Sequence, residues 1–200
     1  MMSGVQEQLF DLQIAQLKHD ELFHKEITRL SIHQRLNHMA LHFAKYSGKI
    51  CDCVLNTPDE QNLKRIIIDS FIISVTCANI LNFRISDRLI SLEEQKFSSL
   101  VDLGGDLINR LGIDMHDPLW LVRVFPVVVG EFAKACESVD HLESFSYRES
   151  MIDSAARICS LMLVAASQLK VDLVSEVSLR LDEVKKKSIF FDYYMISLDQ

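Results

Sequence analysis

The chain has 200 residues, a hydrophobic fraction of 48% and a formal net charge of −7 at pH 7. This length suits one large domain or two small ones, and the apolar content is ample for a full core. The acidic charge argues against a general nucleic-acid binder, whose affinity depends on Lys and Arg contacts to phosphates.

The N-terminal segment and the cysteines bear on the location of the protein. The segment MMSGVQEQLFDLQ lacks a basic region followed by an apolar stretch, and no uncharged run reaches 18 residues. We therefore expect a cytoplasmic protein with no membrane partner. The five cysteines are then expected to be reduced thiols. Cys51-Asp-Cys53 has no second pair, so it is a weak zinc candidate.

In the first half, apolar residues recur at helical spacing. Segments 9–17 and 36–46 follow this pattern. Thr57-Pro58-Asp59-Glu60 predicts a helix start with Pro58 just inside it, and that helix is expected to run to about Phe83. Ser91-Leu-Glu-Glu predicts a further helix start.

The second half has the same spacing. Asp117-Pro118 predicts a helix start, and Pro126 should kink that helix or delay its true start. Ser146 and Glu149 have the spacing of a capping box. A last helix is expected over roughly 173–187. Because no segment keeps a period of two, the sequence predicts an all-α fold.

Three pairs of segments recur in the same order along the chain. LFDLQIAQL (9–17) matches LVDLGGDLI (100–108), Phe-Ala-Lys (43–45) matches Phe-Ala-Lys (132–134), and LEEQK (92–96) matches LDEVK (181–185). The offsets are 91, 89 and 89 residues. Because the pairs are collinear, we predict a duplication with copies over 1–98 and 99–200, packed face to face as one globular unit.

One of these segments resembles a known family. Gly130-Glu131-Phe132-Ala133-Lys134-Ala135, and a helix with an early Asp and a late Ala78-Asn-x-Leu-x-Phe83, resemble the MazG-like all-α nucleoside triphosphate pyrophosphohydrolases. That superfamily includes the dimeric all-α dUTPases. The resemblance implies a helical bundle of two tandem MazG-like repeats, a pseudo-dimer, which uses Mg²⁺ or Mn²⁺ to cleave an NTP or dNTP to the monophosphate and pyrophosphate.

The family carries Glu-x-x-Glu on one helix and Glu-x-x-Asp on the next. Spacing i, i+3 puts two carboxylates on one helix face, and Mg²⁺ prefers such hard oxygen ligands. The bound metal neutralises phosphate charge and supports attack by water. In the second copy Glu131 falls on the second Glu position and Val128 on the first, whereas the first copy has His42 and Met39 there.

On the next helix the match differs between the copies. In the first copy Asp69 falls on the Asp position and Ile66 on the Glu position. In the second copy two alignments stay open, which place either Arg157 or Asp153 on the Asp position. With Asp153, Ser150 falls on the Glu position.

The resemblance thus assigns roles to six residues. Glu131 and Asp69 are the predicted catalytic residues, Asp153 and His42 join them as predicted metal ligands, and Lys45 and Lys134 are expected near the substrate phosphates. The expected partner is a nucleotide, and a homo-oligomer is left open. Because neither copy keeps four carboxylates, the alternative is a non-catalytic nucleotide-binding or protein-interaction module.

Several of these residues could equally have a structural role. His38 and His42 share a helix face and could bind a transition metal with Asp69, or simply pack at an interface. Asp69 interrupts an apolar helix, so it needs either a metal or an ion pair, for example with Lys45 or Arg65. The acidic run 137–143 could supply further ligands or form a solvated helix end.

Overall fold

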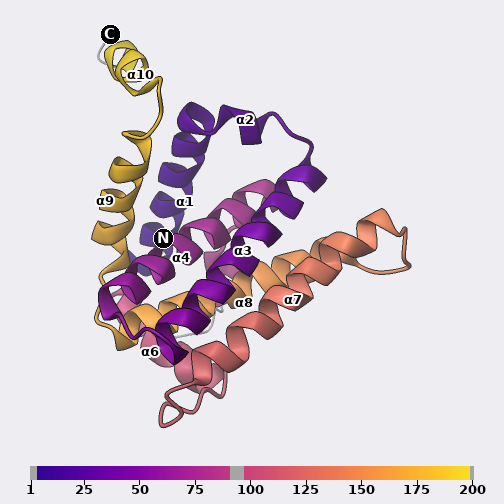
Figure 1. Cartoon of the computed structure of the whole chain (residues 1–200), viewed down its shortest axis with the longest axis vertical. Coiled ribbons are helices and arrows are strands. Elements are labelled where there is room, and N and C mark those ends of the chain that lie inside the picture. Colours follow the sequence, from indigo (N-terminus) through magenta and orange to yellow (C-terminus); the bar gives the residue numbers. More distant parts are fainter. Residues whose placement is uncertain (1–3, 91–96, 199–200) are drawn as a thin grey trace.

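The computed structural model describes residues 4–90 and 97–198, and every regular element in these residues is a helix (Figure 1). The all-α prediction is therefore confirmed. The predicted helix start at Ser91 lies outside the described residues. The helices are α1 (Gly4–Phe23), α2 (Lys25–Thr28), α3 (Ile32–Leu55), α4 (Glu60–Leu81), α5 (Ser86–Leu89), α6 (Leu100–Arg110), α7 (Trp120–Asp140), α8 (Tyr147–Gln168), α9 (Leu173–Lys185) and α10 (Phe191–Leu198).

The helices pack around a central pair, α4 and α8. Helices α3 and α7 contact each other, and each also packs on one member of the central pair: α3 on α4 and α7 on α8 (Figure 1). Helix α6 covers α8, whereas α1 and α9 pack on α4 and on each other. Helix α9 of the second half therefore lies against the first half.

Helix α8 lies in the core of the bundle. Within 151–166 its residues are buried except Asp153 and Arg157. Among the described helices it alone is long and apolar enough to cross a membrane, and 78% of its apolar window is buried inside the molecule. Such burial is the pattern of a core helix, and it leaves this stretch of α8 a single exposed polar stripe, formed by Asp153 and Arg157.

Short polar residues begin several helices, though not always where the sequence predicts. Asp59 is the N-cap of α4 and its carboxylate accepts from the Asn62 amide, so Pro58 precedes the cap and is not inside the helix as predicted. The predicted capping box at Ser146 is wrong, because the Ser146 side chain makes no capping hydrogen bond. A capping box is instead present at Ser31 and Gln34, which begin α3.

Helix α7 starts at Trp120 and continues through Pro126. Of the two effects predicted for Pro126, the delayed start is therefore wrong, and the kink stays a prediction. Proline has no N–H, so its position as the seventh residue of α7 removes one bond to the carbonyl four residues earlier. Packing of α7 on both α3 and α8 keeps the helix in place despite this loss.

Three helices of each half make matching contacts within that half. Helix α3 packs on α4 as α7 packs on α8, and α1 packs on α4 as α6 packs on α8. Between the halves, α3 meets α7 and α4 meets α8, so each of these helices touches its own counterpart. This is the arrangement expected of a pseudo-dimer. The duplication itself, with copies over 1–98 and 99–200, stays a prediction.

The recurring Phe-Ala-Lys segments meet at the centre of this arrangement. Phe43 of α3 and Phe132 of α7 are both fully buried, and their rings contact edge to face with centroids 5.5 Å apart. Edge-to-face contact is a favoured geometry for aromatic rings. The sequence repeat therefore coincides with a packing contact between the halves.

Candidate functional site

The residues with predicted roles separate into two groups. Glu131, Lys134 and Asp153 line one pocket between α7 and α8, which we call the α7–α8 pocket. Asp69 and His42 line another pocket between α1, α3, α4 and α9, which we call the histidine pocket, and Lys45 bonds to His42. The structure therefore does not bring Asp69 and Glu131 to one cavity.

The α7–α8 pocket has a volume of about 520 Å³. Its charged members come from the single polar stripe of α8 and from the facing edge of α7. Both candidates for the family's Asp position, Asp153 and Arg157, line it, so the two open alignments point to the same place. The complete lining is Gly130, Glu131, Lys134, Phe145, Ser150, Asp153, Ser154 and Arg157.

The carboxylates of the α7–α8 pocket are paired with arginines. Glu131 forms an ion pair with Arg157, and both side chains are nearly half exposed. Asp153 lies 3.3 Å from a guanidinium nitrogen of Arg88, which also pairs with Glu149. Pairs this exposed exchange readily with water and ions, so they do not block a ligand from either carboxylate.

Lys134 lies at the rim of the α7–α8 pocket. Its Nζ donates to Glu143 at 2.8 Å and to Glu137 at 3.2 Å. These bonds raise the pKa of the Lys134 ammonium, and the bond from Lys134 lowers the pKa of the Glu143 carboxyl. The acidic run after Lys134 thus neutralises a lysine.

Asp69 is held by an arginine that the sequence did not indicate. Nε and Nη2 of Arg180 donate to its two carboxylate oxygens at 2.6 and 3.0 Å, and the Arg180 and Asp69 side chains are only 12% and 15% exposed. Arg180 takes the place of the predicted partners Lys45 and Arg65. Hydrogen bonding to Asp69 raises the pKa of Arg180, and burial followed by the Asp69 charge raises the pKa of Tyr46.

Lys45, His42 and His38 form a chain of hydrogen bonds along α3. Lys45 Nζ lies 3.1 Å from His42 Nδ1, and His42 Nε2 lies 3.0 Å from His38 Nε2. An ammonium can only donate, so His42 Nδ1 accepts and His42 Nε2 donates to His38. Burial, then Lys45 and His38, lowers the His42 pKa to about 4, which keeps the ring neutral at pH 7.

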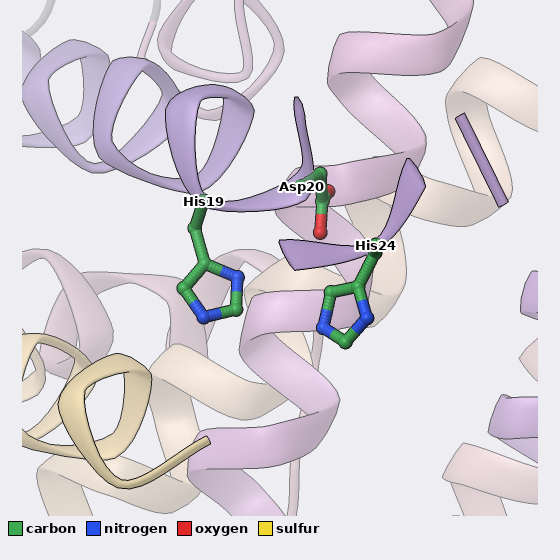
Figure 2. A group of neighbouring side chains, drawn as sticks. All are labelled: His19, Asp20 and His24. Atoms are coloured by element: carbon green, nitrogen blue, oxygen red, sulfur yellow. The ribbon is translucent and has the colours of Figure 1, made fainter. Parts of the chain in front are cut away.

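The histidine pocket contains a further cluster that the sequence reasoning missed. Its volume is about 200 Å³. His19 and Asp20 lie in the last turns of α1, and His24 directly follows that helix (Figure 2). One ligand atom from each lies within 4.8 Å of the other two. The signal in the sequence was His19-Asp20 followed shortly by a second histidine, His24, directly before which the helix ends.

Burial decides the protonation of this cluster. His19 is 7% exposed and Asp20 is 8% exposed. Burial, reinforced by His24, lowers the pKa of His19 to about 4, although the Leu181 backbone acts in the opposite direction. Burial raises the pKa of Asp20, and hydrogen bonds from Gln16 and Thr76 oppose that rise. The His19 side chain is therefore a neutral ring at pH 7.

A comparison of the chain with protein families, curated proteins and solved structures found no match. The MazG-like resemblance and the roles that it implies therefore stay predictions from the sequence.

Proposed function

We propose that this protein is a MazG-like nucleotide-binding protein that holds a metal–nucleotide complex in the α7–α8 pocket. The observation that carries the proposal is that Glu131, Lys134 and Asp153, three residues with predicted roles, line this one pocket. Its volume of about 520 Å³ lies within the usual range for pockets that bind small molecules.

The metal, the phosphates and the base of a metal–nucleotide complex each have a matching group in the pocket. Glu131 and Asp153 offer hard oxygen ligands to Mg²⁺ or Mn²⁺. When the metal takes Glu131, the Arg157 guanidinium becomes available to the phosphate oxygens. Lys134 lines the same pocket, and its ammonium can exchange the exposed Glu137 and Glu143 carboxylates for a phosphate oxygen. Phe145 is 44% exposed and offers a flat apolar face on which a base can stack.

The same pocket lacks groups that cleavage in the resembled family uses. The partner position of Glu131 is Val128, which is fully buried, and the partner position of Asp153 is Ser150. Two carboxylates can hold one ion against the phosphates. They leave no second acidic pair to position and activate a water, a task that metal-assisted hydrolysis adds to substrate binding. We therefore propose binding without turnover.

A second candidate is the active enzyme, an NTP or dNTP pyrophosphohydrolase dependent on Mg²⁺ or Mn²⁺. The juxtaposition of Glu131 and Asp153 in one pocket favours it. In that case the two carboxylates would suffice for the chemistry, with the exposed pocket supplying water. The same set of measurements separates the two functions.

The test is calorimetric titration of the full chain with each common NTP and dNTP, with and without Mg²⁺ or Mn²⁺, alongside an assay for released pyrophosphate. We expect metal-dependent binding and no pyrophosphate. Glu131→Gln should weaken binding by roughly 10- to 100-fold, because a hydrogen bond or ligand bond to an ionised group contributes about 1.5–3 kcal/mol.

Glu60→Gln is the matched control, since Glu60 is an exposed glutamate on α4 that pairs with Lys64 four residues on. It should bind as the wild type does. Steady release of pyrophosphate that Glu131→Gln abolishes would establish the second candidate instead. Absence of binding to every nucleotide, or binding that Glu131→Gln leaves unchanged, would overturn both.

A further inference from the structure

We propose that His19, Asp20 and His24 bind a divalent transition-metal ion of the zinc type in the histidine pocket. This inference is independent of the proposed nucleotide binding, because none of the three residues lines the α7–α8 pocket. Among the described residues, no other set of three His, Cys, Asp or Glu side chains brings its ligand atoms so close together.

The ligand atoms of the cluster are spaced nearly as closely as those around a bound zinc ion. The three ligand atoms lie within 4.8 Å of one another, and tetrahedral zinc with bonds of about 2.0–2.1 Å places its ligand atoms about 3.3 Å apart. The side chains converge from the end of α1 and from the turn before α2 (Figure 2). His24 is half-buried, and a turn of its side chain would close the remaining distance to the ion.

His19 is the member whose present state most needs a ligand. Both of its ring nitrogens are buried, and neither makes a hydrogen bond of good geometry within the described residues. A buried polar group without such a bond costs about 1–3 kcal/mol. A metal bound through one nitrogen removes that cost for that nitrogen, and the neutral ring needs to lose no proton to accept it.

Asp20 is oriented as metal-binding carboxylates usually are. Gln16 Nε2 donates to one carboxylate oxygen at 2.9 Å, and Thr76 Oγ1 donates to the other at 3.2 Å. Outer partners of this kind fix the direction of a metal ligand. His24 and Arg35 line the same pocket and favour the ionised form of Asp20, and a cation bound to the carboxylate would favour that form more directly.

The donor set selects the class of metal. Two imidazoles and one carboxylate suit zinc and neighbouring first-row metals, whereas Mg²⁺ and Ca²⁺ prefer oxygen ligands alone. Glu26 lies 3.5 Å from Nδ1 of His24 and adds negative charge at the edge of the cluster. Three protein ligands leave a position open toward the pocket, which water or a small anion can occupy.

The test uses the full chain, freed of metal by a chelator and with no affinity tag. Zn²⁺ is titrated against a competing chromophore, and Co²⁺ is titrated while its visible absorption is recorded. We expect one ion per chain, Co²⁺ bands typical of nitrogen and oxygen ligands, and no competition from Mg²⁺. Zn²⁺ should also raise the midpoint of thermal unfolding.

His24→Gln and Asp20→Asn should each weaken Zn²⁺ binding by at least the roughly 10- to 100-fold that loss of an outer partner costs. His116→Gln, at an exposed histidine outside the cluster, is the control and should bind normally. Circular dichroism checks that each variant is folded. Zn²⁺ binding that both cluster variants leave unchanged would overturn the proposal.

A measurement on the wild type tests the same site without depending on whether the variants fold. Zn²⁺ should shift the imidazole nitrogen resonances of His19 and His24 in ¹⁵N spectra, and leave those of His116 and His141 in place. Shifts confined to other histidines, or no binding of Zn²⁺ at all, would equally overturn the assignment.

Discussion

Among single residues, Asp69 and Arg180 form the ion pair that we expect to matter most for stability. It joins the middle of α4 to α9, and both side chains are largely buried. Buried ion pairs contribute little compared with apolar packing, but removing one partner leaves a buried charge with nothing to balance it. The pair therefore fixes where α9 sits on the first half of the chain.

Arg180→Met should lower the free energy of unfolding by about 3–5 kcal/mol, because it leaves the buried Asp69 carboxylate without its ion-pair partner. Urea unfolding followed by circular dichroism measures the loss. Arg88→Ala is the control, since Arg88 pairs with Glu149 and Asp153 at the surface and should cost less than about 1 kcal/mol. The double variant Asp69→Leu with Arg180→Met should recover much of the stability. Equal losses for Arg180→Met and Arg88→Ala would contradict this role of the pair.

The buried histidines predict how stability depends on pH. The folded-state pKa of His19 is about 4, against 6.5 for an exposed ring. Between these values the unfolded chain binds a proton that the folded chain does not, so stability falls as the pH drops from about 6.5 to about 4. The shift corresponds to roughly 3 kcal/mol for His19. His42 acts in the same direction, whereas the raised pKa of Asp20 acts against it.

Urea midpoints of the metal-free protein at pH 7 and pH 5 measure this effect. The wild type should lose stability between the two, and His19→Gln should lose clearly less because its amide does not titrate. His141→Gln, at an exposed position, should follow the wild type. If His19→Gln lost as much stability between pH 7 and pH 5 as the wild type does, burial of the His19 ring would not govern the acid sensitivity.

Among the elements, α6 and α8 make a close approach at a glycine. A Cβ at Gly104 would lie 2.5 Å from the Leu163 carbonyl oxygen and 2.8 Å from Ser167 Cβ. The adjacent Gly105 has nothing within 4 Å of the same position. Glycine at 104 is therefore a packing requirement, whereas glycine at 105 only lowers helix propensity.

Gly104→Ala should destabilise the protein by roughly 1–3 kcal/mol, because α6 must move away from α8. Gly105→Ala should stabilise it by about 0.5–1 kcal/mol, because alanine is the better helix former and restricts the unfolded chain. Chemical unfolding of the two variants and the wild type measures both changes in the free energy of unfolding, which should have opposite signs. Destabilisation by Gly105→Ala, or tolerance of Gly104→Ala, would show that the helices are packed differently.

At the scale of the whole molecule, one core spans both halves. The buried residues of α4 and α8 form a single continuous cluster, and Phe43 and Phe132 extend it between α3 and α7. Neither half can bury its apolar face without the other. The chain should therefore unfold as one unit.

Trp120, the single tryptophan, lies in the second half, where its indole N–H donates to Gln168. Its fluorescence and the circular dichroism of all helices should show the same urea transition. Ile67→Ala, a core change in the first half, should lower the stability reported by Trp120 by the same roughly 2–5 kcal/mol that circular dichroism records. Leu55→Ala, at an exposed position, should leave the stability nearly unchanged by both measurements. If Ile67→Ala left the urea transition of Trp120 fluorescence unchanged, the two halves would unfold separately.

How much the sequence revealed differs between these scales. Helical spacing of apolar residues predicted most of the helices, since that spacing reflects which face of a helix is buried. Helix boundaries were predicted less well. Ser146 has the composition of a capping box and Ser31 does too, yet only Ser31 caps. Local composition permits a cap, and the backbone conformation of the cap residue differs between the two, with ψ of 156° at Ser31 and 65° at Ser146.

The sequence by itself determined the all-α class, the buried faces of the long helices and the recurrence of Phe-Ala-Lys, because each depends on contacts within a few residues or on direct comparison of segments. Only the tertiary structure decided the partners of the charges. It paired Asp69 with Arg180, 111 residues away, and Glu131 with Arg157, and it closed His19, Asp20 and His24 into one cluster. The two ion pairs depend on which helices pack together, which no local spacing encodes, and the cluster depends on where α1 ends and on the burial that the neighbouring helices impose.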